Sequence, residues 1–206
     1  QMALSARKRP ANPMPVGDTD PFRPDRGRPL RVRARSMQAD AHFEPHSHAW
    51  AQLAYCASGI VQVSAERSTY IVPPSRAVWV APGVRHSVHV LEDAEFRTLY
   101  IDASATPPGW THCRVLVVSP LLRELVQALD NAPDEPREAM LTGLVLDELA
   151  RADTHALGVP LPDAQTGDKR LRALCEAVLG APAQRATLAE WSAEFGASER
   201  TMLAKR

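Results

Sequence analysis

The sequence predicts a mainly β plus α protein, in which a small β barrel or sandwich comes first and helices follow. Between about residues 31 and 119, polar and apolar residues alternate in many short runs that turn residues separate. After Ser119, apolar residues recur instead at the three- and four-residue spacing of helices. The content of 45% hydrophobic and 23% charged residues is that of a globular chain with a substantial core.

The first 30 residues are rich in proline and arginine and show no periodicity. Because proline fixes φ and removes backbone donors, we expect residues 1–30 to be a disordered tail. Residues 1–35 carry nine Arg or Lys against three Asp or Glu, whereas residues 36–167 carry eight against sixteen. The basic ends of the chain suit a polyanion, although the first 35 residues could equally be a solvated tail.

Seven runs between residues 31 and 102 alternate as strands do, and VLVVS at 115–119 is a last one. They are RVRARSMQA, WAQLAYCA, IVQVSAE, STYIV, AVWVA, HSVHVL and EFRTLYID. The turns expected between them are Ser58-Gly59, Pro73-Pro74-Ser75, Pro82-Gly83 and Glu92-Asp93. Closing or doubling such a sheet removes exposed strand edges, which favours a barrel or a sandwich over residues 31–119.

Two helices are expected over residues 120–154. Ser119 is a cap followed by proline, and the stripe after it contains Leu121, Leu122, Leu125, Val126 and Leu129. The second helix, at about 136–152, carries Met140, Leu141, Leu144, Val145 and Leu149. One stripe could form a homodimer interface, and packing on the outer face of the sheet is the alternative. Residues 155–167 have the composition of a linker.

The segment 168–206 is again helical. Thr187 and Glu190 have the spacing of a capping box, so a helix begins there, with Leu188, Trp191 and Phe195 on its buried face. Gly196 permits a tight turn before a next helix, an order typical of a helix-turn-helix and also of ordinary helical hairpins. On the first interpretation, the candidate DNA-contacting residues are Ser198, Glu199, Arg200, Thr201 and Lys205.

The stretch PHSHAWAQLAYCASG, residues 45–59, contains the candidate metal ligands. His46, His48 and Gln52 share parity, so on one extended strand they would point to the same face. Imidazoles suit zinc, nickel, iron or copper, whereas the uncharged amide of Gln52 is a weaker ligand than a carboxylate. The alternative is that both histidines are polar residues at the mouth of a strand, bonded to each other or to water.

These features together resemble the AraC/XylS class of bacterial transcription regulators, in the subgroup with an N-terminal cupin sensor domain. The resemblance runs from about residue 31 to residue 201, and PPSRAVWVAPGVRHSV and SERT are similar to two of its motifs. It implies a cupin-type double-stranded β barrel, a small-molecule effector, a homodimer, and DNA binding by the full-length protein. It also implies a further ligand, His86, and a divalent metal such as zinc, nickel or iron, with Gln52 standing where metal cupins carry a glutamate.

The chain departs from this family at its end. Only 39 residues follow Gly167, too few for two helix-turn-helix units, and MLAKR does not match the pattern usual after SERT. We therefore expect a fragment with an incomplete helix-turn-helix domain over 168–206.

Aromatic residues on the predicted strands suggest a ligand pocket, because inward positions of a small barrel can enclose one ligand. The candidates, which could equally be ordinary core residues, are Trp50, Tyr55, Trp79 and Tyr100.

A ligand-responsive regulator is therefore the leading hypothesis, and we expect no enzyme activity because the sequence shows no phosphate loop, nucleophile elbow or paired catalytic acids. The alternative is a metal-dependent cupin isomerase or dioxygenase with a helical dimerisation tail. No apolar run reaches the roughly 18 residues of a membrane span, and no secretory signal is recognised. Three widely spaced cysteines are consistent with a reducing, cytoplasmic setting.

Overall fold

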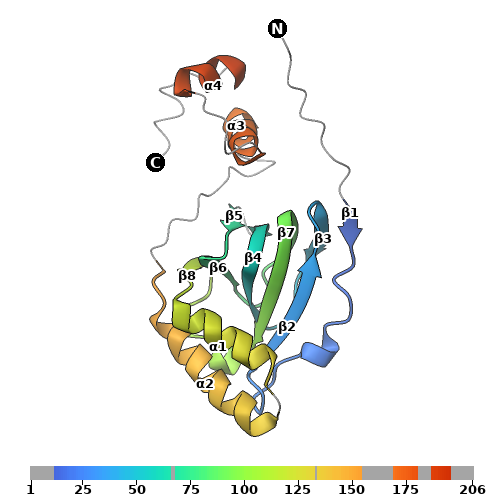
Figure 1. The fold of residues 1–206 in the computed structure, drawn as a ribbon, viewed down its shortest axis with the longest axis vertical. Coiled ribbons are helices and arrows are strands. Elements are labelled where there is room, and N and C mark those ends of the chain that lie inside the picture. Colours follow the sequence, from blue (N-terminus) through green and yellow to red (C-terminus); the bar gives the residue numbers. More distant parts are fainter. Residues whose placement is uncertain (1–11, 66–67, 133, 155–168, 181–186, 196–206) are drawn as a thin grey trace. The chain divides into compact units, whose positions relative to one another are not determined.

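The computed structural model describes residues 12–65, 68–132, 134–154, 169–180 and 187–195 (Figure 1). The chain divides into two units, of which the first contains the sheet with two helices and the second contains two further helices. The strands are β1 (Asn12–Met14), β2 (Leu30–Met37), β3 (Ala41–His46), β4 (Ala51–Ala65), β5 (Ser68–Val72), β6 (Arg76–Val80), β7 (His86–Ile101) and β8 (Arg114–Val117).

The eight strands form one sheet in which β4 and β7 are central. The order is β1-β3-β7-β4-β6-β8, with β2 also paired to β7 and β5 to β4. The first half of β7 pairs with β3 and its second half pairs with β2. The single long strand β7 therefore connects these two strands in the sheet. β2, β3 and β4 all run antiparallel to β7, which agrees with the predicted mainly β architecture.

β4 and β7 correct the predicted turns. We expected hairpin turns at Ser58-Gly59 and Glu92-Asp93, but each pair lies inside a continuous strand, and the β4–β7 register shifts between Cys56 and Val61. Gly59 has φ of 76°, and a Cβ there would lie 2.1 Å from the carbonyl oxygen of Asp93. The glycine therefore serves an irregularity that bends the strand and not a chain reversal.

Two hydrophobic cores lie on opposite faces of the curled sheet. The inner core takes residues from every strand from β2 to β8 and none from the helices that the structure describes, as expected of a barrel interior. Its members are Met37, Ala41, Phe43, Ala54, Cys56, Val61, Val63, Val72, Val78, Val80, Val88, Val90, Ala94, Phe96 and Val115. On β4, even-numbered residues up to Cys56 face this core and odd-numbered residues from Val61 do so, because the irregularity at Gly59 switches the parity.

The outer core lies between the sheet and the helices α1 (Pro120–Asp130) and α2 (Glu135–Arg151), which cover one face of the sheet (Figure 1). Its sheet members include Leu30, Leu53, Tyr55, Trp79, Leu99 and Ile101. From the helices it takes Leu122, Leu125, Val126, Leu129, Leu141, Val145 and Leu149.

Both helices confirm the local signals of the sequence. The hydroxyl of Ser119 accepts a hydrogen bond of 3.0 Å from the backbone N–H of Leu122, as an N-cap does, and Asp134 caps α2 in the same way. The hydroxyl of Ser119 also donates to Glu148, which joins the start of α1 to α2. Both apolar stripes pack on the outer face of the sheet, yet Leu121, Met140 and Leu144 remain exposed.

The N-terminal segment is more ordered than predicted. β1 pairs in parallel with β3, and a 3-10 helix follows at Asp20–Phe22, so the described part of residues 1–30 is not a featureless tail. Pro13 lies in β1, which pairs with a single strand, an edge position where a missing backbone donor is tolerated.

The second unit contains α3 (Lys169–Gly180) and α4 (Leu188–Phe195). The predicted capping box is present, since Thr187 N–H donates to the Glu190 carboxylate at 2.6 Å and Glu190 N–H donates to the Thr187 hydroxyl at 3.3 Å. Trp191 is buried as expected. The candidate DNA-contacting residues, Ser198 to Thr201 and Lys205, lie outside the described residues. None of the described helices combines the length and apolar character that crossing a bilayer requires.

Candidate metal and ligand site

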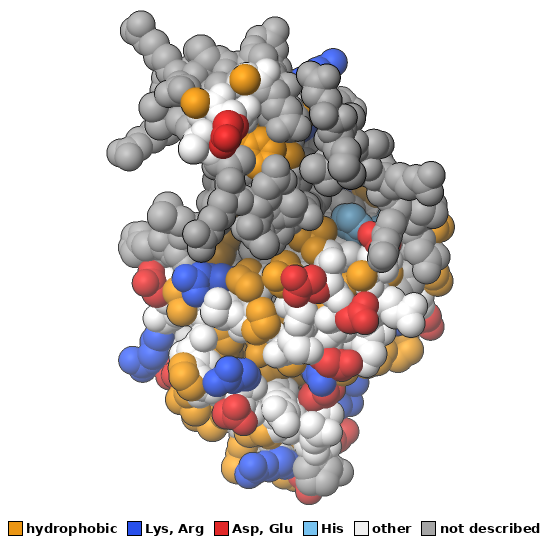
Figure 2. Space-filling model, turned by 45° about the horizontal axis from the view of Figure 1, so that its top comes forward, with side chains coloured by type: hydrophobic (Ala, Val, Ile, Leu, Met, Phe, Trp, Pro, Cys, Tyr) orange, Lys and Arg blue, Asp and Glu red, His pale blue; other side chains and the backbone are white. Residues whose placement is uncertain are grey.

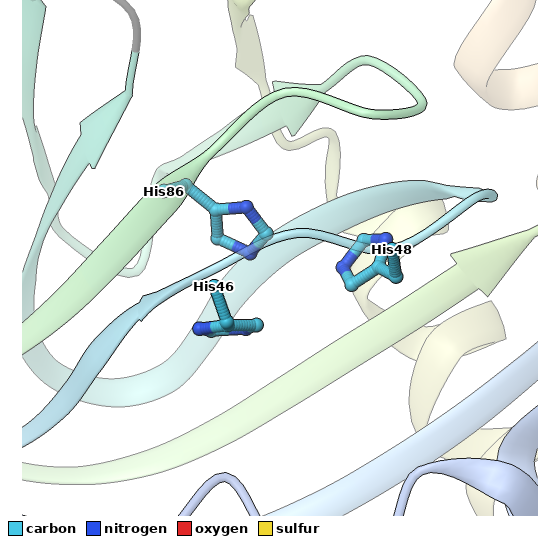
Figure 3. Close-up of side chains that lie close together, drawn as sticks. All are labelled: His46, His48 and His86. Carbon is cyan, nitrogen blue, oxygen red and sulfur yellow. The ribbon is translucent and has the colours of Figure 1, made fainter.

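Three histidines converge at one end of the sheet (Figure 3). His46 is the last residue of β3, His48 follows in the connection to β4, and His86 is the first residue of β7. The antiparallel register places His46 directly opposite His86, and their ring centroids lie 4.4 Å apart. One nitrogen from each of the three rings can be chosen so that all lie within 4.8 Å of one another.

The turn before β7 holds the connection that carries His48. Val84 N–H donates to the Ala81 carbonyl at 3.2 Å, and Gly83 takes a φ of 76° in the turn so formed. Gly83 N–H then donates to the carbonyl of His48 at 2.8 Å, which ties the two segments together. The Pro82-Gly83 turn predicted from the sequence therefore positions both His48 and His86.

The predicted parity relationship is wrong, although the residues do meet. His46, His48 and Gln52 do not share one strand, because β3 ends at His46 and β4 begins at Ala51. β4 lies next to β7 in the sheet, so Gln52 reaches the histidines from this neighbouring strand. Gln52 is buried there and lies opposite Tyr100 of β7.

Each histidine contacts a backbone carbonyl through Nδ1. The distances are 2.8 Å from His46 to Glu44, 2.7 Å from His48 to Trp50 and 3.0 Å from His86 to Val84. Because a carbonyl only accepts hydrogen bonds, each Nδ1 carries the proton and each neutral ring keeps a free lone pair on Nε2. Metal-ligating histidines in proteins are commonly oriented in this way.

Gln52 lies against two of these Nε2 atoms. Its Oε1 atom is 2.9 Å from Nε2 of His48 and 3.3 Å from Nε2 of His86. Two unprotonated nitrogens facing a carbonyl oxygen repel it, so this arrangement requires either the reversed amide, with its NH2 donating to both rings, or a cation among the three groups.

Burial favours the uncharged form of two of the three histidines, His46 and His86. It lowers the pKa of His86 to about 4 and also lowers the pKa of His46, while the neighbouring histidines act in the same direction. Imidazoles that stay neutral are available as metal ligands without first losing a proton.

The aromatic candidates separate into two pairs. Trp50 stacks on His48 with centroids 5.3 Å apart, its buried Nε1 has no hydrogen-bond partner among the described residues, and Tyr100 lies edge-on to both rings. Tyr55 and Trp79 belong instead to the outer core beneath α1 and α2. The prediction that these two line the pocket is therefore wrong. Tyr55 faces the opposite side of the sheet from Gln52 on β4, and Trp79 faces the opposite side from Val80 on β6.

A small cavity adjoins the histidines inside the barrel. Its volume is about 20 Å³, and its lining consists of Val16, Arg33, Arg35, Phe43, His46, Gln52, Val88, Phe96, Thr98 and Tyr100. Arg33 and Arg35 were not predicted to line it. Their shared parity with Met37, an inner-core residue on the same strand, is the signal that could have placed them inside.

The fold and the site define a cupin-type β barrel, in which three histidines could hold a metal ion beside an internal cavity. The chain belongs to the family of AraC-like ligand binding domains, whose model matches residues 29–199, and the resemblance noted in the sequence is thereby confirmed.

The relatives extend this comparison. The chain is 33% identical over 162 residues to the HTH-type transcriptional regulator NimR of Escherichia coli; the match covers 76% of the chain and 57% of NimR. The chain thus spans little more than half the length of that relative. Among solved structures, apo ToxT K231A of Vibrio cholerae is 10% identical, with 89% of this chain and 75% of that chain covered and a TM-score of 0.46. The W96F oxalate decarboxylase of Bacillus subtilis is 27% identical, with coverages of 37% and 22% and a TM-score of 0.34.

Proposed function

We propose that this chain is the effector-sensing part of a bacterial transcription regulator. The observation that supports the proposal is its membership of the AraC-like ligand-binding family, together with 33% identity to a named regulator. An effector in the barrel would change DNA binding only by as much as its affinity differs between the two arrangements of the protein. Such a regulator would work in the cytoplasm, where the DNA is.

Ser198, Glu199, Arg200, Thr201 and Lys205 are the residues proposed to contact DNA. In the gene product that contains this chain, they would lie at the start of a recognition helix, after the capped helix α4.

DNase footprinting of that gene product on the DNA upstream of its own gene and of the neighbouring genes is the test. We expect protection of a defined site that weakens as salt rises, since phosphate contacts release counterions. Arg200→Ala should weaken the protection, whereas Arg76→Ala, an exchange on a barrel strand, should leave it unchanged. Protection with no preference for any sequence would contradict the proposal.

We propose further that His46, His48 and His86 bind one divalent transition metal through Nε2, with Gln52 as a neutral fourth group. The fit rests on the three Nδ1–carbonyl hydrogen bonds and on the two Nε2 atoms that face Gln52. Bonds of about 2.0–2.1 Å to one ion require the rings to close up slightly from their present spacing. Three neutral nitrogens suit zinc, nickel or iron, and a bound ion would supply a Lewis-acidic position next to the cavity.

A second function is supported by the same histidines, because three imidazoles with an open position also occur in metal enzymes. The competing proposal is a cupin isomerase or dioxygenase. Gln52 argues against the dioxygenase, because an uncharged amide stabilises an oxidised metal less than a carboxylate does. Turnover of a small organic acid by the metal-loaded protein, lost in His86→Asn, would favour the enzyme.

The proposed regulator is a homodimer. Leu121 of α1 and Met140 and Leu144 of α2 are exposed by 55%, 61% and 54%, on helices whose other large apolar side chains are buried or partly buried. We propose that a second copy of the chain covers them.

Acidic and basic side chains are interspersed on the face seen in Figure 2, with no extended area of one charge among the described residues drawn there.

A further inference from the structure

Two partly buried arginines of β2 line the cavity inside the barrel. Leu30 and Val32, at even positions, pack in the outer core, whereas Met37, at an odd position, belongs to the inner core. Arg33 and Arg35 share the parity of Met37, and both line the cavity beside His46 and Gln52. An inward position of a small barrel is ordinarily apolar, so two guanidinium groups there need a partner.

No carboxylate compensates these charges within the part of the chain that the structure describes. Arg33 and Arg35 form no ion pair there, and the lining of the cavity contains neither Asp nor Glu. Each guanidinium instead lies over an aromatic ring, Arg33 at 5.1 Å from the centroid of Phe22 and Arg35 at 5.0 Å from that of Phe43. Burial, and then the charge of Arg33, lower the pKa of Arg35.

Both guanidinium groups converge on one backbone oxygen. Arg33 Nη1 donates to the carbonyl of Val16 at 3.1 Å, and Arg35 Nη2 donates to the same atom. The Nη2 atoms of the two arginines lie 3.0 and 3.1 Å from the position that a Cβ on Gly17 would take, so they are close together. Two forked cationic donors directed at a single oxygen form the arrangement that binds a carboxylate.

We propose that Arg33 and Arg35 bind the carboxylate of an apolar monocarboxylic acid, and that this acid is the effector. The inference rests on the proposed sensor function and names the chemical class of its ligand. Phe43, Val88 and Phe96 on the same cavity wall provide an apolar surface for the body of the acid, which a phosphate ester or a sugar would not use.

The carboxylate takes the place of the Val16 carbonyl. A cavity of about 20 Å³ holds roughly one water molecule, so the acid fits when residues 15–17 leave the mouth of the barrel. The exchange replaces a neutral acceptor by an anion, which adds the attraction between opposite charges to hydrogen bonds in which only the arginines were ionised.

Calorimetric titration with benzoate and butanoate tests the inference, with benzamide and butanamide as uncharged probes of the same shape. We expect both acids to bind more tightly than their amides, and less tightly as salt rises. Arg33→Gln and Arg35→Gln should each weaken acid binding by about 10- to 100-fold, the usual effect of losing hydrogen bonds to a charged group. Arg31→Gln is the matched control, because Arg31 lies on the same strand but faces Glu138 of α2 at 3.8 Å.

Arg33→Lys and Arg35→Lys keep the charge and lose the forked geometry, so they should weaken binding less than the glutamine variants. If a glutamine variant melts at a markedly lower temperature than the parent, the corresponding lysine variant replaces it in the test of acid binding. Equal binding of acid and amide, or tighter binding of inorganic phosphate than of either acid, would overturn the inference.

Acid binding that is lost in His86→Asn but kept in both glutamine variants would place the anion on a metal instead and would equally overturn it. Zinc content and DNA protection are measured on the same samples. If both are intact while neither acid binds, the carboxylate inference alone has failed and the proposed regulator stands.

Discussion

The Nε2 atom of His48 lies 2.9 Å from the Oε1 atom of Gln52, and His48 Nδ1 is already committed to the Trp50 carbonyl. Gln52 therefore lies where it would meet an ion held by the histidines, and it supplies no charge there. We predict that Gln52→Glu raises zinc affinity by at least about tenfold, the lower end of the effects of groups that surround bound metals. Competition with a zinc-binding dye would measure the change.

Gln62→Glu is the matched control for this variant, because Gln62 lies on the same strand and pairs with His89, away from the three histidines. It should leave zinc affinity unchanged. Equal affinities of Gln52→Glu and the parent would mean that Gln52 is not near the ion.

Removing one imidazole should abolish the site. We predict that His86→Asn reduces zinc, measured by atomic emission after dialysis, to near background, since two neutral ligands hold the ion far less well than three. His89→Asn, a residue of the same strand with the opposite parity, should retain the metal of the parent. Retention of the metal by His86→Asn would contradict the assignment of the three-histidine site.

The stability of the metal-free barrel should depend on pH through His86. Burial lowers its folded pKa to about 4 from an ordinary value of 6.5, so between these values the unfolded chain binds more protons than the folded chain. The stabilisation is complete above about pH 6.5 and is lost as pH falls towards 4, by up to on the order of 3 kcal/mol. His46, whose pKa is lowered as well, adds to the change in the same direction.

Urea unfolding of EDTA-treated protein at several pH values between 7.5 and 4 would measure this dependence. His86→Gln, which does not titrate, should flatten the curve in that range. Stability that stays constant or rises as the pH is lowered would contradict the buried neutral state of His86.

Gly59 is predicted to be essential to the bend of β4. Gly59→Ala should destabilise the protein by about 3 kcal/mol or more, because the added Cβ collides with the Asp93 carbonyl in addition to the left-handed backbone strain. Gly109→Ala is the control, with a φ of 78° but nothing within 4 Å of its Cβ, and should cost about 1–2 kcal/mol from backbone strain alone. Equal losses in urea unfolding would show that the close approach at Gly59 is unimportant.

Gly59 also illustrates what the sequence could and could not predict. Local signals succeeded: the Ser119 cap, the Thr187–Glu190 box and the Pro82-Gly83 turn all act over three or four residues. Ser58-Gly59 resembles a hairpin turn in the sequence, and its role as an irregularity follows only from the close approach of Gly59 to the backbone of Asp93, far along the chain. The order and spacing of the strands were largely predictable, but β1 and β3 were missed and two strands, β4 and β7, were each divided.

The candidate site was likewise predictable only in part. His86 was associated with His46 and His48 through the family resemblance, and the register of β3 and β7 supplies the physical reason. Tyr55 and Trp79 were misplaced because one irregularity and the packing of two helices decide which parity faces inward. Arg33 and Arg35 looked like part of a basic N-terminus until the parity of their strand was fixed by Met37.

The exposed residues of α1 and α2 give the last prediction. Met140 and Leu144 lie one turn apart on α2, so they present a single apolar surface, to which Leu121 of α1 adds a third exposed apolar side chain. If a second copy of the chain covers this surface, Leu144→Glu places a charge in an apolar interface and should convert the dimer to a monomer. Light scattering coupled to gel filtration would measure the mass. Ala139→Glu adds the same charge to an exposed position on another side of α2 and should remain dimeric. A monomeric parent, or a Leu144→Glu variant that is still a dimer, would show that these residues do not join the two copies.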